Sequence, residues 1–177
     1  MRSFSCAAIA AHIHLTGYWF IPAEADQDWT PPPAVQEFLQ QGPAPIYIGF
    51  GSMSSRKPVE TTHLILQALA QTGQRAILLS GWNGLAAERL PATALVVESI
   101  PHDWLFQHVA AVVHHGGAGT TAAGLRAGVP SIVIPFFADQ PFWGQRVADR
   151  GVGPRPIPRQ QLTAARLAYA LDQAATK

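Results

Sequence analysis

The chain has little cysteine and little charge. Cys6 is its one cysteine, which excludes an intrachain disulfide and a cysteine-rich zinc site. Charged residues make up 13% of the 177 residues and the formal net charge is +1, so no strong field is available to attract nucleic acid. We therefore expect a protein of a reducing compartment that does not bind nucleic acid.

The sequence also lacks long apolar runs and the spacings typical of metal ligands. Its longest apolar stretches, such as SIVIPFFA at 131–138, are shorter than the ~20 residues that span a bilayer. The amino-terminal run SCAAIAAHIHL is interrupted by His12 and His14, which is not typical of a signal peptide. No HxxxH or equivalent spacing of histidines and carboxylates occurs. We expect a cytoplasmic chain with no transmembrane segment and no metal site.

The composition that remains, 48% hydrophobic, is that of a globular domain with a proper core. Residues 1–45 are irregular and rich in proline, apart from VQEFLQQG at 35–42, which predicts a short helix. We predict that 1–45 is an interdomain linker segment wrapping a nucleotide-sugar-binding, Rossmann-like domain at 46–177. The expected anchors of the linker are Trp19, Phe20 and Trp29.

Apolar runs of strand length alternate with helical patterns from residue 46 onward. The predicted strands lie in PIYIGF, RAILLSG, ALVVES, AAVVHH and SIVIP. The predicted helices cover 58–72, 120–127, 140–150 and 162–177. This alternation predicts an α/β fold, with a parallel sheet covered by helices on both faces. Such sheets bind ligands beyond the carboxyl ends of their strands, so the loops after the strands are the candidate site.

The stretch VVHHGGAGTT at 112–121 predicts a phosphate site. Glycines at 116, 117 and 119 let the backbone approach a ligand closely, and the helix that follows directs its free N–H groups to the same place. The turn lacks the lysine of a P-loop. His115 can donate a hydrogen bond to a phosphate oxygen while neutral, whereas strand alternation directs His114 into the core.

Two further strand exits carry polar groups suited to a nucleotide sugar. GFGSM offers a second close backbone approach and the hydroxyl of Ser52, although its glycines would also suit a plain tight turn. Asp139 and Gln140 are adjacent at a helix start, where a carboxylate and an amide suit vicinal sugar hydroxyls. Asp139 could instead only cap the helix.

Aromatic residues follow the remaining strands. Trp82, His102 and Trp104 lie near the same predicted edge, where an aromatic ring could stack on a base. Core packing is the alternative, above all for Trp104 within the apolar run WLF.

A different class of ligand fits one pattern in the same turn. Residues 117–122 read GAGTTA, which matches GxGxxA, and Asp139 lies near the acidic spacing of an NAD site. The fingerprint follows a late strand, however, and Asp139 lies beyond Pro135 rather than at a strand tip. An NAD-binding Rossmann module of an oxidoreductase is therefore the weaker alternative.

The segments GFGSM and SIPHDWLFQHVAAVVHHGGAGTTAAGLRAGVPSIVIPFFADQPFWGQRV closely resemble the carboxyl-terminal half of GT-B glycosyltransferases that use UDP-sugars. The patterns TGYWF and PIYIGFGSM are similar to those of sterol 3-β-glucosyltransferases and their bacterial homologues. The resemblance covers about residues 16–175. It implies a UDP-sugar donor domain, with UDP-glucose the expected donor and no cofactor beyond this substrate.

The resemblance also implies a role for individual positions. The expected diphosphate-binding residues are Ser52, His115, Gly117, Gly119 and Thr120. Asp139 and Gln140 are expected to bind the donor sugar. Ile100 and His102 match the stretch that contacts uracil, and Trp82 is the expected stacking residue, because plant members have a tryptophan where this chain has Ser99.

Catalysis by such an enzyme needs a second domain. In the GT-B family the base that activates the acceptor hydroxyl lies in the amino-terminal domain, and the resemblance implies that this chain corresponds to the other domain. We therefore expect no catalytic residue in the chain and no turnover by it alone. A sterol or another lipid or natural-product hydroxyl would be the acceptor, bound through the other domain. Peripheral association of the full-length protein with a membrane is compatible with such an acceptor.

Overall fold

The computed structural model describes residues 14, 16–20, 29–50, 58–79 and 90–175. Two of the predicted site residues, Ser52 and Trp82, lie outside this part of the chain.

The described residues form one parallel sheet with the strand order β3-β2-β1-β4-β5. The strands are β1 Ile46–Gly49, β2 Ala76–Leu79, β3 Ala94–Val97, β4 Ala111–His114 and β5 Ser131–Val133. Each falls within a predicted apolar run, and the predicted α/β fold class is confirmed. The edge strand β3 departs most from the expected burial, because all its residues are half-buried.

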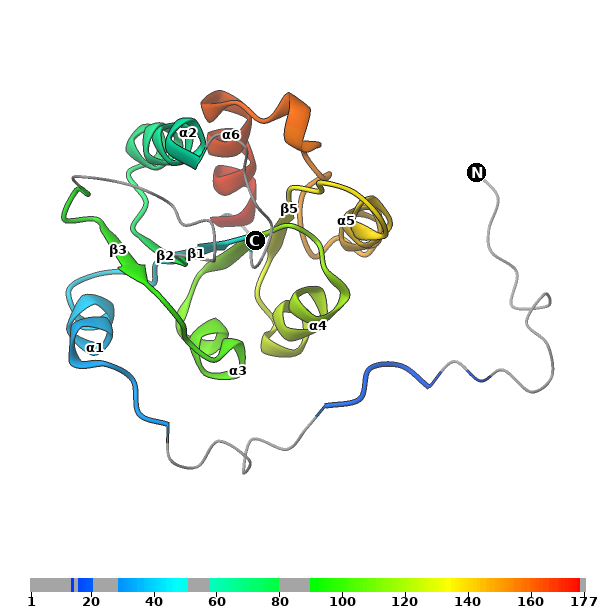
Figure 1. Ribbon diagram of the computed structural model, residues 1–177, viewed down its shortest axis with the longest axis horizontal. Coiled ribbons are helices and arrows are strands. Elements are labelled where there is room, and N and C mark those ends of the chain that lie inside the picture. The colour runs from blue at the N-terminus through cyan, green and yellow to red at the C-terminus, as the bar shows by residue number, and fades with distance from the viewer. Residues whose placement is uncertain (1–13, 15, 21–28, 51–57, 80–89, 176–177) are drawn as a thin grey trace.

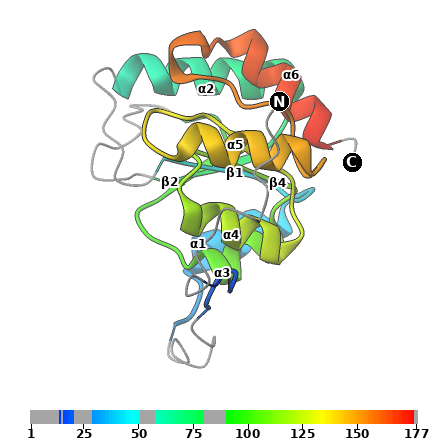
Figure 2. The same ribbon diagram turned by 90° about the vertical axis from the view of Figure 1, so that its right-hand side faces the viewer.

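Helices cover both faces of the sheet (Figures 1 and 2). One face carries α2 Pro58–Thr72 and α6 Ala164–Ala175, and the other carries α1 Pro33–Gln40, α3 His102–Leu105 and α4 Ala118–Ala127. Helix α5, Gln140–Asp149, packs beside β5, and short 3-10 turns occupy Phe106–His108 and Arg159–Gln161.

The alternation of side chains along each strand produces two cores. In β1, Ile46 and Ile48 pack toward α2 and α6, while Tyr47 packs toward α1 and α3. In β4, Val112 belongs to the second core and Val113 to the first. A strand buried on both faces must be apolar throughout, which is why these runs are continuous rather than alternating.

Helix α1 joins the end of the predicted linker to the domain. Its residues Val35 and Phe38 are buried in the second core. Arg75, just before β2, donates hydrogen bonds to the carbonyl oxygens of Phe38 and Pro43, and its guanidinium lies 4.1 Å from the Phe38 ring centroid. The domain boundary at residue 46 stays a prediction.

Helix α3 corrects one expectation, because part of SIPHDW was expected to be a loop after a strand. The segment turns into a helix at His102, and the amide of Leu105 donates to the carbonyl of Pro101 at 2.9 Å. A helix of four residues is too short to show a 3.6-residue hydrophobic period, so the sequence carried no periodic signal for it.

Candidate functional site

The candidate site lies where the strand order reverses. Strands β1 and β4 are neighbours, with Gly49 paired with His114, yet they lead to crossovers on opposite sides. In an open parallel sheet, the carboxyl ends of two such strands border the crevice that binds ligands. The glycine turn after β4 and the FFADQ loop after β5 both open at this edge.

The glycine turn has the geometry of an anion site. Gly116 has a φ of 92°, in the left-handed region that glycine tolerates. Helix α4 then begins at Ala118 with Gly117 as its N-cap, and no side chain caps it. The amides of the first turn, including those of Gly119 and Thr120, therefore have no helical acceptor, and a Cβ at Gly119 would meet open space.

His114 supports this turn from within the core, as predicted. Its side chain is fully buried, and its Nδ1 accepts a hydrogen bond of 3.1 Å from the amide of Gly116. Burial, helped by the neighbouring His115 and His102, lowers the pKa of His114 to about 3. The imidazole is therefore neutral at pH 7, with its proton on Nε2.

His115 faces the start of α4. Its ring is half-buried, and the Nε2 lies so close to Gly117 that an added Cβ there would be 2.5 Å away. Burial lowers the pKa of His115, and the carboxylate of Asp139 partly opposes this shift. A neutral imidazole in this place can donate one hydrogen bond without adding a fixed cation. Its role toward a phosphate stays a prediction.

The FFADQ loop places Asp139 on the surface at the N-cap of α5. The side chain makes no capping hydrogen bond, and Oδ2 instead accepts from the indole Nε1 of Trp143 at 2.8 Å. The alternative in which Asp139 only caps the helix therefore does not describe its contacts. A tryptophan holds the carboxylate in one orientation beside the glycine turn.

Gln140 is placed differently from the exposed amide that the sequence suggested. Its side chain is buried, and Oε1 accepts from the amides of Phe136 at 2.8 Å and Phe137 at 3.2 Å. The Gln140 oxygen therefore holds the loop that carries Asp139. The loop also touches the glycine turn, since a Cβ on Gly116 would lie 3.0 Å from the Gln140 carbonyl oxygen.

Sequence reasoning missed Tyr18 as a neighbour of this site. Its ring centroid lies 5.8 Å from that of Trp143, and burial together with the charge of Asp139 raises the pKa of the Tyr18 hydroxyl. The pattern TGYWF contained this residue, but nothing in the local sequence showed that it returns to α5.

Ile100 and His102 lie on the other side of the glycine turn. Ile100 is buried in the second core, whereas His102 is half-buried, with its ring stacked on Phe106 at 4.5 Å. Burial and the nearby His115 lower the pKa of His102, although Asp103 opposes the shift. The hydroxyl of Tyr47 lies 3.1 Å from His102 Nε2.

Trp104 is half-buried and packs against other aromatic rings. Its ring lies 5.2 Å from that of Trp29 and stacks on His108 at 4.3 Å, against the second core. The core-packing alternative for Trp104 is therefore supported. Of the three expected anchors of the linker, Trp29 packs against the second core, whereas Trp19 is 85% exposed and Phe20 is 45% exposed.

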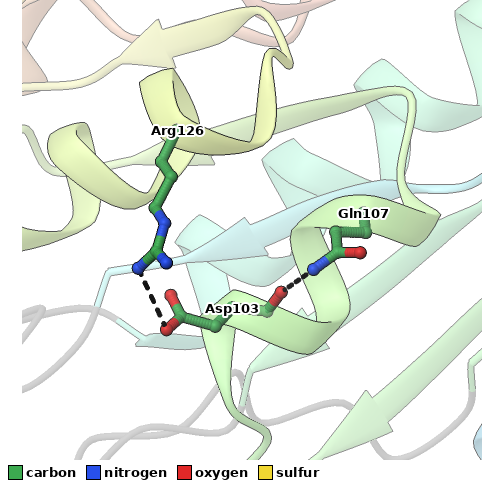
Figure 3. A network of polar contacts seen from close by, with 3 residues as sticks. All are labelled: Asp103, Gln107 and Arg126. Atoms are coloured by element: carbon green, nitrogen blue, oxygen red, sulfur yellow. Dashed lines mark hydrogen bonds and ion pairs between the residues drawn. The ribbon is translucent and has the colours of Figure 1, made fainter. Parts of the chain in front are cut away.

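A polar network ties the helix of His102 to the helix of the glycine turn (Figure 3). Arg126 of α4 pairs with Asp103 of α3 at 3.8 Å, and Gln107 donates to the Asp103 carbonyl oxygen at 2.6 Å. Both partners of the ion pair are about half exposed, so its contribution to stability is small. The network nevertheless ties α3 to the last turn of α4, at the opposite end of that helix from the glycine turn.

Comparison with known proteins shows to which family the chain belongs. Residues 63–176 match the family model of the erythromycin biosynthesis protein CIII-like C-terminal domain. The chain belongs to this family. The chain is 45% identical over 161 residues to a sterol 3-beta-glucosyltransferase of Arabidopsis thaliana, an alignment that covers 90% of the chain and 25% of that protein. It is 44% identical over 153 residues to one of Aspergillus fumigatus, covering 80% of the chain and 11% of that protein.

Solved structures extend the comparison to the fold. The chain aligns with Arabidopsis thaliana UGT89C1 complexed with UDP at a TM-score of 0.69 and 22% identity, covering 88% of the chain and 41% of UGT89C1. The predicted relationship to the carboxyl-terminal half of GT-B glycosyltransferases is confirmed. The domain spans about a quarter or less of the length of the sterol glucosyltransferases named above. These matches give no support to the NAD-binding alternative.

The described ranges contain neither a membrane-spanning helix nor a cluster of metal-binding side chains. No helix there is both long enough and apolar enough to cross a membrane. Nor does any group of three or more His, Cys, Asp or Glu side chains in those ranges have the geometry to hold a metal ion.

Proposed function

We propose that this domain binds the UDP-sugar donor, with UDP-glucose as the first candidate, in an inverting glycosyltransferase that glycosylates a sterol or another lipid or natural-product hydroxyl. The observation that carries the proposal is the joint placement of an uncapped helix N-terminus, a neutral histidine and a carboxylate held in one orientation at one strand-exit crevice. The names of the relatives support the reaction class: sterol 3-beta-glucosyltransferases in sequence, and UGT89C1 with UDP or UDP-L-rhamnose in structure.

The diphosphate would lie at the start of α4. Oriented amides at Gly119 and Thr120 and the positive end of the helix dipole favour an anion there. His115 would add a hydrogen bond from a neutral ring. Dipoles and a weakly basic imidazole stabilise the charge that builds on departing UDP without a tight ion pair that would delay its release.

The sugar would lie between the glycine turn and Asp139. Asp139 Oδ2 is occupied by Trp143, and Oδ1 can accept from a sugar hydroxyl. Gln140 acts on the sugar chiefly through the loop that its side-chain oxygen holds. Ile100 and His102 would border the uracil and ribose, and Ser52 and Trp82 stay predictions for the diphosphate and the base.

The chemical step needs groups outside this chain. An acceptor hydroxyl, deprotonated by a base of the amino-terminal domain, would attack the anomeric carbon from the face opposite UDP and invert its configuration. This domain would contribute the position of the donor and the stabilisation of the leaving group. It would need no cofactor, and alone it would not turn over. In the full-length protein we place it in the cytoplasm, peripheral to the membrane that holds a sterol acceptor.

Calorimetric titration of the purified chain with UDP, UDP-glucose, UDP-L-rhamnose and NAD tests the proposal. We expect saturable binding of the UDP compounds, none of NAD, and a roughly tenfold weaker UDP affinity in His115→Ala, from the loss of a hydrogen bond to a charged group. His63→Ala is the matched control, because His63 is exposed on α2 across the sheet. Tight binding of NAD, or an unchanged UDP affinity in His115→Ala, would contradict the proposal.

A further inference from the structure

A buried hydroxyl in the sheet has its hydrogen-bond partner at the candidate site. Tyr47 lies in the middle of β1 with 1% of its surface exposed, and its hydroxyl is 3.1 Å from Nε2 of His102. The rings meet edge to face at 5.5 Å. Because a buried hydroxyl without a partner costs free energy, phenylalanine would be the simpler residue for packing alone. We therefore infer that the Tyr47 hydroxyl is present for its hydrogen bond with His102.

The strand leaves room for this contact. A Cβ at Gly49, two residues after Tyr47 on the same side of β1, would collide with the hydroxyl and Cζ of Tyr47. Without a side chain at Gly49, the phenol ring lies along the strand toward its carboxyl end, where the hydroxyl reaches His102. Phe106 completes the arrangement by stacking on the imidazole with an interplanar angle of 17°.

The contact selects one tautomer of His102. If the Tyr47 hydroxyl donates to Nε2, the ring proton must be on Nδ1 and both groups are satisfied. In the opposite arrangement His102 donates from Nε2, and the hydroxyl proton of Tyr47 is buried with no acceptor among the described residues. That arrangement costs the desolvation of an unpaired donor.

The nitrogen that receives the proton is the one open to a ligand. Among the described residues, Nδ1 of His102 makes no hydrogen bond. It is also not one of the buried histidine nitrogens without a partner, which are His114 Nε2 and His115 Nδ1, so Nδ1 of His102 is not enclosed. The titratable groups around the ring are Asp103 of its own helix, Tyr47 of β1 and the two histidines after β4. Asp103 is engaged by Arg126.

We propose that Tyr47 is a positioning residue that holds His102 as the Nδ1–H tautomer, so that the imidazole presents a fixed N–H donor to an oxygen of the bound nucleotide. The bound nucleotide in this proposal rests on the proposed function, whereas the tautomer of His102 does not.

Nitrogen-15 NMR of the ligand-free chain decides the tautomer, with His102→Gln used to assign the signals. We expect a bare Nε2 and a protonated Nδ1 in the wild type, and a mixture of tautomers in Tyr47→Phe. Tyr169→Phe, which alters an exposed tyrosine of α6, should leave the signals unchanged. A protonated Nε2 in the wild type, or the same tautomer in Tyr47→Phe, would overturn the proposal. If Tyr47→Phe does not fold, the wild-type signals alone decide.

Titration with UDP and CDP measures the consequence for binding. We expect Tyr47→Phe to bind UDP about 3- to 10-fold more weakly, the effect of one hydrogen bond. Cytosine carries an amino donor where uracil has a carbonyl oxygen, so a loss seen only with UDP assigns the acceptor to the base. An equal loss with both assigns it to the O2 carbonyl that the two bases share, to the ribose or to the phosphates. An unchanged affinity would overturn the positioning role, whereas no UDP binding by the wild type would contradict the proposed function and leave the NMR result standing.

Discussion

A Cβ atom at Gly117 would lie 2.5 Å from Nε2 of His115, closer than non-bonded atoms approach, so the histidine ring occupies the space that a side chain at residue 117 would need. Two residues later, the same addition at Gly119 meets no atom within 4 Å. A side chain at Gly117 would therefore clash with the His115 ring, whereas the fold leaves room for a side chain at Gly119.

Gly117→Ala should displace the His115 ring. We expect its NMR signals to shift in the free protein and UDP affinity to fall about tenfold, as for the loss of His115 itself. Gly119→Ala is the matched control: the His115 signals should stay in place, and helix propensity should raise stability by about 0.5–1 kcal/mol. Unshifted His115 signals in Gly117→Ala would show that the ring is not confined.

Asp139→Asn should weaken the binding of the sugar but not of the nucleotide. An asparagine oxygen can still accept from Trp143, so the loop should keep its shape while the charge is lost. We expect UDP-glucose to bind about 5-fold more weakly, from the loss of a charge-assisted hydrogen bond, with little change for UDP. Asp149→Asn, at the other end of α5, is the control. An equal loss for both ligands would place Asp139 at the diphosphate instead.

Acid should destabilise the fold through His114. Its pKa is lowered to about 3 in the folded state from 6.5, so below pH 6.5 the unfolded chain takes up a proton that the folded chain does not. The free energy of unfolding should therefore fall as the pH drops from about 6.5 toward 3, by up to about 1.4 kcal/mol per pH unit. The lowered pKa values of His102 and His115 act in the same direction.

Urea unfolding at pH 7, 6 and 5 measures this slope. His114→Asn keeps an acceptor for the Gly116 amide and should flatten the slope, whereas His63→Asn, on the exposed side of α2, should not. An equally steep slope in His114→Asn would mean that other groups cause the acid sensitivity.

Gly153→Ala should destabilise the domain without touching the site. A Cβ at residue 153 would collide with the carbonyl oxygen of Ser131, and it would lie 2.6 Å from Cγ1 of Val147. A backbone oxygen of a buried strand cannot move aside, so we expect a loss of about 2 to 3 kcal/mol in the free energy of unfolding. Gly151→Ala meets no atom within 4 Å and should cost about 1–2 kcal/mol, from its positive φ alone. Similar losses in both variants would contradict the steric argument.

The sequence predicted those helices and strands that are marked by an apolar pattern or end beside a glycine. The runs around Ile48, Val113 and Ile132 are strands because both faces of the sheet are covered, and α2 and α4 end beside Gly73 and Gly128, as the glycines indicated. Of the candidate site, the glycine turn and the buried state of His114 followed from local rules: strand alternation and the conformational freedom of glycine.

Contacts between distant segments could not be predicted in this way. Tyr47 and His102 are 55 positions apart, and only the parallel pairing of β1 with β4 and the turn of α3 bring them together. A local contact was not predicted either: the side-chain oxygen of Gln140 accepts from the amides of Phe136 and Phe137, three and four positions away. That contact depends on the path of the loop, which no spacing in the sequence encodes.

Strands β4 and β5 are neighbours both in the sheet and along the chain, and this has a consequence for inheritance. Apart from Ser52, the proposed diphosphate and sugar contacts lie on one uninterrupted stretch between Ala111 and Asp149. A genetic exchange with its breakpoints outside that stretch transfers them together, already in register. Tyr47 and His102 lie upstream, so the same exchange would bring the proposed nucleoside contact from the other parent.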